Sequence, residues 1–179
     1  MLPDVLGQDL DIVFCGTAPG AVSAALRAYY AGPGNAFWLT LFAVGLTPQR
    51  LLPGDFRSVI RWKLGLTDLA KRVSGSDGDL CPEHFDAQRL RGVIRRYQPR
   101  ILAFTSKRAA AEFLGRRVGY GETPENEGTT RLFVLPSPSG AARRYWNQAY
   151  WQELADLRHQ PVEMSARTLP LSTDVAAEM

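Results

Sequence analysis

Two short loops of small residues are the most distinctive chemical feature of this sequence. They read Gly16-Thr17-Ala18-Pro19-Gly20 and Pro136-Ser137-Pro138-Ser139-Gly140. Glycines let backbone N–H groups approach an anion closely, so the first loop can cradle a negatively charged group. It lacks the lysine of a Walker motif and the glycine spacing of a dinucleotide fingerprint. Its one polar side chain is that of Thr17, and any acid or base must therefore come from another part of the chain.

Short apolar runs alternate with helical patterns and position these loops. The apolar runs predict strands at Asp11–Cys15, Ile101–Thr105 and Arg131–Leu135. Helical periodicity predicts helices at Ala21–Tyr30, Ala36–Val44, Phe56–Leu64, Asp86–Tyr97, Lys107–Leu114 and Tyr145–Arg158. The polar, glycine-rich segment 115–130 predicts a surface loop or a hairpin. This alternation favours an α/β fold around a parallel sheet, with ligands bound beyond the carboxyl ends of the strands. One loop follows the first strand and the other follows the last, so together they can form a narrow slot for a flat ring.

Length and composition indicate one domain. The chain has 179 residues and 45% hydrophobic content, and we expect the domain to span residues 1–160, with a flexible tail at 161–179. The net charge is +3, and arginines crowd residues 88–100, which suits either a polyanion or a solvated helix face. Two cysteines without ligand spacing predict free thiols and no metal site. We expect a cytoplasmic monomer with no membrane partner.

Five motifs together resemble a known family, the mismatch-specific uracil-DNA glycosylases, which are relatives of the thymine-DNA glycosylases. The motifs are VFCGTAPG at 13–20, AGPGNAFW at 31–38, GLTDLAKR at 65–72, YQPRILAF at 97–104 and VLPSPSGAARR at 134–144. The resemblance covers the chain up to about Arg158. It implies a three-layer α/β/α fold with a central, mainly parallel sheet. It also implies a monofunctional enzyme that removes uracil, and other deaminated bases, from DNA to initiate base excision repair, without a cofactor.

The sequence departs from the family at the catalytic side chain. The asparagine that positions the attacking water in the family is Ala18 here, and the asparagine of the second family motif is Ser137. Breaking the N-glycosidic bond requires a carboxylate or a positioned water near the sugar, so another residue must act. We predict that Asp68 in GLTDLAKR is this catalytic group. The alternative is that Thr67 and Asp68 cap the start of a helix.

The resemblance also assigns residues that contact the substrate. Tyr30 matches the aromatic residue that stacks on the flipped base, although Tyr29 and Tyr30 can also be ordinary aromatics at a helix end. The base-binding candidates are Gly16, Thr17, Ala18, Pro19, Tyr30, Asn35 and Ser137. The DNA-binding candidates are Ser23, Ser139, Gly140, Ala141, Ala142, Arg143 and Arg144. The stretch Ala141–Arg143 matches the wedge that fills the gap left by the flipped nucleotide, while Arg143 and Arg144 can instead contact phosphates.

Two other functions remain open at this point. A catalytically inactive relative that binds DNA lesions would keep the fold and the slot without the asparagine. A nucleotide-binding module would use Gly16–Gly20 as an anion site and prefer free nucleotides to DNA. Loss of activity on Asp68→Asn, with DNA binding retained, would distinguish the enzyme from both.

Overall fold

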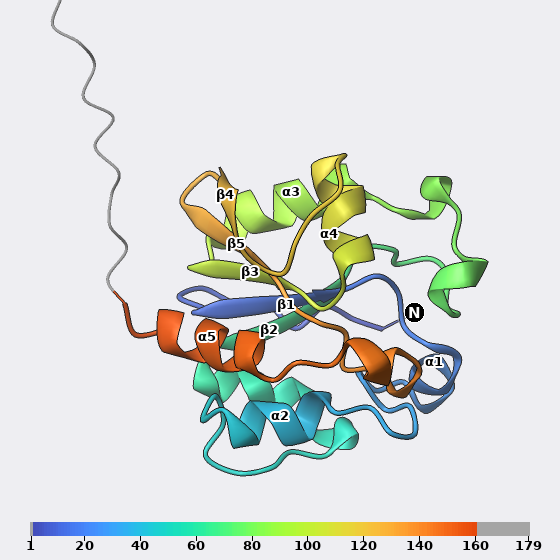
Figure 1. Cartoon of the computed structure of the whole chain (residues 1–179), viewed down its shortest axis with the longest axis horizontal. Helices are drawn as coiled ribbons and strands as arrows, with labels where there is room; N and C mark the ends of the chain where they lie inside the picture. Colours follow the sequence, from blue (N-terminus) through green and yellow to red (C-terminus); the bar gives the residue numbers. More distant parts are fainter. Residues whose placement is uncertain (1, 161–179) are drawn as a thin grey trace, which may run out of the picture.

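The computed structural model of the protein describes residues 2–160, and the expected tail at 161–179 lies outside this part of the chain. A five-stranded sheet forms its centre, in the order β2-β1-β3-β5-β4. The strands are β1 (Ile12–Gly16), β2 (Leu64–Asp68), β3 (Ile101–Phe104), β4 (Gly121–Glu127) and β5 (Thr130–Val134). The first four strands in that spatial order are parallel, and β4 pairs with β5 in the antiparallel direction. Figure 1 shows the sheet between helices above and below it.

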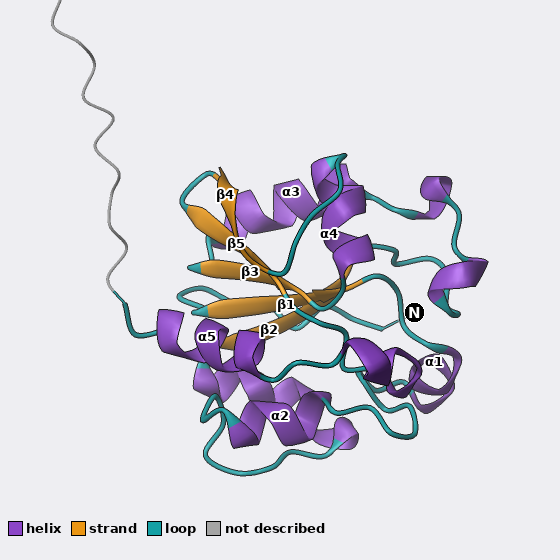
Figure 2. Cartoon of the chain, viewed as in Figure 1, coloured by secondary structure: helices purple, strands orange, loops and turns teal. Residues whose placement is uncertain are grey.

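Helices cover both faces of the sheet and complete three layers, as Figure 2 shows. One face carries α3 (Ala87–Tyr97) and α4 (Lys107–Leu114), which pack with Val13, Leu102 and Val134. The other face carries α2 (Phe37–Ala43), the 3₁₀ helix η1 (Pro53–Trp62) and α5 (Ala149–Leu157), which pack with Phe14 and Phe133. Neighbouring residues of one strand therefore enter different cores, because side chains alternate across a sheet. The predicted three-layer α/β/α class is confirmed.

The remaining short elements lie in the connections. They are α1 (Ala21–Leu26) and the 3₁₀ segments η2 (Asp77–Asp79), η3 (Pro82–His84) and η4 (Gly140–Tyr145). Within residues 2–160 no helix is long and apolar enough to cross a membrane.

The sequence expectations differ from the structure most around residues 53–68. The predicted helix Phe56–Leu64 is a 3₁₀ helix that ends at Trp62, and Leu64 begins β2, a strand that the apolar pattern did not reveal. The predicted helix Ala21–Tyr30 ends earlier, at Leu26, because Arg27 adopts a left-handed conformation with φ 51°. The helix expected from Tyr145 begins instead at Ala149. The sequence predicts a surface loop or a hairpin for segment 115–130. This segment contributes β4, which forms a hairpin with β5.

Candidate active site

The carboxyl ends of β1 and β2 bring Gly16 and Asp68 side by side, since these two residues are partners in the parallel ladder. A β-carbon placed on Gly16 would lie 2.7 Å from Oδ1 of Asp68, 3.6 Å from the Tyr30 hydroxyl and 3.8 Å from Oγ1 of Thr105. Three polar groups from separate parts of the chain therefore converge on Gly16. A side chain there would occupy the space of the Asp68 carboxyl, so glycine is needed for close packing.

Asp68 is buried in an unusual state for a carboxyl group. It is 2% exposed, and its Oδ2 atom has no hydrogen-bond partner among the described residues. Burial raises the pKa of Asp68 from 3.8 to about 7, and the Asp4 carboxylate adds to this rise, while Lys71 and Arg89 oppose it. A pKa near neutrality suits a general base, because such a group is both partly ionised and basic enough to accept a proton.

An ion network anchors the strand end that carries Asp68. The Asp4 carboxylate accepts hydrogen bonds from Lys71 at 2.8 Å, from Arg89 at 2.9 Å and from the Thr67 hydroxyl at 2.8 Å. Arg89 also donates to the backbone carbonyl of Asp68 at 2.6 Å. These contacts fix the backbone of residues 67 and 68 without neutralising the Asp68 side chain. The alternative that Thr67 and Asp68 begin a helix is wrong, since both lie in β2.

The first small-residue loop is held by its carbonyl groups. Those of Gly16, Thr17 and Pro19 accept hydrogen bonds from the amides of residues 69, 70 and 75. The Thr17 hydroxyl is 3.0 Å from that of Ser106, so this side chain supports the loop from the start of α4. The amides of Thr17, Ala18 and Gly20 make no hydrogen bond to another described residue. They remain available to an anion, as expected for a base-binding loop.

Tyr30 stands beside Asp68 in the turn after α1. Its backbone has φ 52°, its ring stacks on Phe37 with 3.8 Å between centroids, and its hydroxyl lies 3.4 Å from Oγ1 of Thr105. Contacts at both ends of the side chain fix the plane of the ring. Tyr29 is buried in the core, whereas Tyr30 is partly exposed, and neither belongs to a helix. Thr105 is a site residue that sequence reasoning missed, because its role depends on the neighbouring strand.

The second small-residue loop packs directly on residues 33–36. The Ala36 amide donates to the Pro138 carbonyl at 2.8 Å, and a β-carbon on Gly140 would lie 3.2 Å from the Pro33 carbonyl oxygen. Asn35 accepts a hydrogen bond from the Phe37 amide at 3.0 Å and so supports the start of α2. Ser137 accepts one from the Ser139 amide at 3.3 Å. Both predicted base-binding side chains thus stabilise the loops. Asn35 keeps its NH₂ group, and Ser137 keeps its hydroxyl hydrogen, as possible donors.

The DNA-binding candidates divide into an exposed set and one buried residue. The exposed or half-buried set forms or borders η4 and comprises Ser139, Gly140, Ala141, Ala142, Arg143 and Arg144. Ser23 is 6% exposed, and its hydroxyl oxygen accepts a hydrogen bond from the Ala31 amide at 3.0 Å. Ser23 therefore supports the turn that carries Tyr30, and its assignment as a DNA contact stays a prediction.

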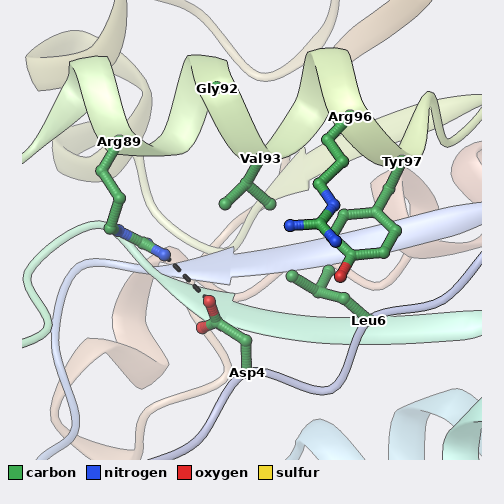
Figure 3. A pocket seen from close by; sticks show the side chains of 7 residues that line it. All are labelled: Asp4, Leu6, Arg89, Gly92, Val93, Arg96 and Tyr97. Atoms are coloured by element: carbon green, nitrogen blue, oxygen red, sulfur yellow. Dashed lines mark hydrogen bonds and ion pairs between the residues drawn. The ribbon is translucent and has the colours of Figure 1, made fainter.

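Three of the four arginines of α3 are engaged with carboxylates. Arg89 pairs with Asp4, and Arg91 and Arg95 both pair with Glu127. The hollow beside this helix has a volume of about 450 Å³ and is drawn in Figure 3. Its lining residues are Asp4, Leu6, Arg89, Gly92, Val93, Arg96 and Tyr97. Neither Asp68 nor Tyr30 lines it, but Asp4 and Arg89 do, so the hollow borders the ion network on the side of α3.

Comparison with known proteins shows the family and the fold of this chain. The sequence profile of the Uracil DNA glycosylase superfamily matches residues 3–156. The fold is similar to the solution NMR structure of a candidate uracil DNA glycosylase from Methanosarcina acetivorans, with a TM-score of 0.61 and 23% sequence identity. That match covers 89% of this chain and 97% of the other. The chain therefore belongs to the uracil DNA glycosylase superfamily.

Proposed function

We propose that this chain is a monofunctional, mismatch-type DNA glycosylase that hydrolyses the N-glycosidic bond of uracil and other deaminated bases. The observation that carries the proposal is the buried Asp68 carboxyl, whose Oδ2 has no partner among the described residues and which stands over Gly16 beside Tyr30. Membership of the superfamily supports glycosylase chemistry in general. The position of Asp68 supports a route that does not need the missing asparagine.

Asp68 serves this reaction as the base for water. The bond between the sugar C1′ and the base nitrogen breaks, and its electron pair leaves with uracil. A water oxygen forms the new bond to C1′, and its proton passes to the Asp68 carboxylate. The same negative charge stabilises the cationic sugar that develops on the way.

The first loop and Tyr30 serve the leaving base. Free amides of the loop donate hydrogen bonds to the uracil anion as it forms. The Tyr30 ring, held by Phe37, offers a fixed face on which an extruded base stacks. The loops 16–20 and 136–140 follow β1 and β5 at the same edge of the sheet, and we infer that the flat ring of the base binds between them.

A single-turnover assay tests the role of Asp68. Duplexes carrying U:G, U:A, T:G or hypoxanthine, and single-stranded uracil DNA, are incubated with excess protein and then cleaved with alkali. We expect Asp68→Asn to lower the excision rate by about 10²-fold or more, the usual scale for a general base. Asp55→Asn is the matched control, because Asp55 is an exposed carboxylate of η1.

The same assay separates the enzyme from an inactive lesion binder. A binder would release no base in either form while still preferring uracil-containing DNA. For the enzyme, the wild-type rate should rise with pH through about 7, since only ionised Asp68 accepts a proton. Full activity of Asp68→Asn would overturn the assignment. It would mean that the amides of the loop and a water molecule without a base are enough for the reaction.

A further inference from the structure

Two basic side chains at the carboxyl edge of the sheet have aromatic rings rather than carboxylates as partners. On α3, Arg89, Arg91 and Arg95 are engaged with carboxylates, whereas Arg96 lies over the Tyr97 ring. Within residues 2–160, Lys107 and Arg144 make no ion pair and lie over tyrosine rings instead. Lys107 Nζ is 4.1 Å from the Tyr120 ring centroid, and the Arg144 guanidinium is 4.6 Å from that of Tyr145. Neither charge is therefore paired with a carboxylate of residues 2–160.

Three tyrosines gather around these cations. The rings of Tyr120 and Tyr150 are 5.3 Å apart, and Tyr145 is 55% exposed, which is high for a large aromatic side chain. Partial burial raises the pKa of Tyr120, and the nearby Tyr145 and Tyr150 hydroxyls add to that rise. Tyr145 is the last residue of η4 and lies just before α5, which carries Tyr150, so the three tyrosines belong to neighbouring segments. We name this group with its two cations the tyrosine strip, comprising Lys107, Tyr120, Arg144, Tyr145 and Tyr150.

The topology places the tyrosine strip at the same edge as Asp68. Lys107 begins α4 directly after β3, and Tyr120 precedes Gly121, which pairs with Val134 at the end of β5. The η4 turn follows β5 and leads through residues 146–148 into α5. The hydrogen bond between Thr17 and Ser106 joins the base-binding loop to the start of α4. A DNA strand in the site can therefore continue onto the strip.

The chemistry of the strip fits an unpaired nucleic-acid strand. Exposed aromatic rings stack with bases only where those bases are free of their partners, and adjacent cations bind the phosphates between them. A paired duplex would use the cations but would leave the tyrosine faces without a function. We propose that the tyrosine strip binds unpaired nucleotides flanking the target base, with Tyr145 stacking on a base and Lys107 contacting a phosphate. The identity of this strand as DNA rests on the proposed function.

Binding of uracil-free DNA tests the strip without any chemistry. A blunt duplex is compared with the same duplex carrying a single-stranded extension of about six nucleotides, a length within the usual site size. We expect the extension to tighten wild-type binding five-fold or more and Tyr145→Ala to abolish that gain. Lys107→Gln should lower the log-log salt slope for the extended DNA by about 0.7, the value for one single-strand phosphate contact.

Two surface variants elsewhere serve as controls. Phe42→Ala removes an exposed aromatic ring from α2, and Arg96→Gln removes an exposed arginine that lies over the Tyr97 ring on α3. Both should retain the full gain from the extension. Equal wild-type affinity for blunt and extended DNA would overturn the proposal. The proposal would also be wrong if Phe42→Ala lost as much of the gain from the extension as Tyr145→Ala, or if the wild type bound a duplex with a matched RNA extension more tightly.

Excision from a blunt uracil duplex, measured in parallel, separates this inference from the proposed function. Tyr145→Ala should excise uracil from the blunt duplex at the wild-type rate. If the wild type releases no uracil but still prefers the extension, the glycosylase proposal fails and the strip stands. If Tyr145→Ala slows excision from the blunt duplex as much as it weakens binding of the extension, Tyr145 contacts paired DNA and the strip proposal is wrong.

Discussion

Replacing Asp68 by asparagine should remove activity and at the same time stabilise the fold at neutral and alkaline pH. The folded protein holds the Asp68 proton up to a pH of about 7, whereas an ordinary aspartate loses it near 3.8. Between these values the folded state binds more protons than the unfolded state. The free energy of unfolding must then fall as pH rises through this window, and it levels off above pH 7. An asparagine cannot ionise, so residue 68 does not lower the free energy of unfolding of the variant in this pH window.

The size of the effect follows from the two pKa values. The interval from 3.8 to about 7 corresponds to about 4 kcal/mol, at about 1.36 kcal/mol for each pH unit. Solvent screening does not reduce this value much, because Asp68 is 2% exposed. We therefore expect the free energy of unfolding of Asp68→Asn to rise by about 4 kcal/mol relative to that of the wild type between pH 4 and pH 8.

Urea unfolding of both proteins across this pH range measures the difference directly. Subtracting the two curves cancels every group whose pKa is the same in both proteins, which isolates the titration of Asp68. The exposed control Asp55→Asn should give a nearly flat difference curve. A flat curve for Asp68→Asn would refute the reasoning, because it would mean that the carboxyl is solvated or fully neutralised by Lys71 in the folded protein.

Three further predictions follow from the geometry of the site. Tyr30→Ala should weaken binding of uracil-containing DNA by about 1–3 kcal/mol of lost stacking; an equal loss for undamaged DNA would contradict this role. Gly16→Ala should lower the single-turnover rate by about 10²-fold, because its β-carbon would displace the Asp68 carboxyl, the proposed base. Gly20→Ala, where a β-carbon has open space, is the control, and equal rates in both variants would exclude the steric argument. Arg143→Gln should lower the salt slope of duplex binding by about 0.9, whereas Arg95→Gln, which breaks a pair with Glu127, should leave it unchanged.

Local patterns in the sequence predicted the framework of this protein. The apolar runs around Phe14, Ala103 and Phe133 specify buried strands, because a strand covered on both faces is apolar throughout. The proline and glycine turns after two of them indicate where a ligand can bind. The strand β2 escaped detection, since its sequence LGLTD is short and contains a glycine and two polar residues. Its place in the sheet comes from pairing with β1 and from the bridge between Val5 and Leu66, which are non-local contacts.

Tertiary structure alone decided the electrostatic state of the site. The sequence singled out Asp68, but only packing against β1 buries its carboxyl and raises its pKa. The partners Asp4, Lys71 and Arg89 come from three separate segments, so no local spacing links them. The same holds for Arg89, Arg91 and Arg95 of α3, whose charges look free in the sequence and are paired with distant carboxylates in the fold. Periodicity reports which residues are buried, whereas pairing between distant charges depends on how the elements are brought together.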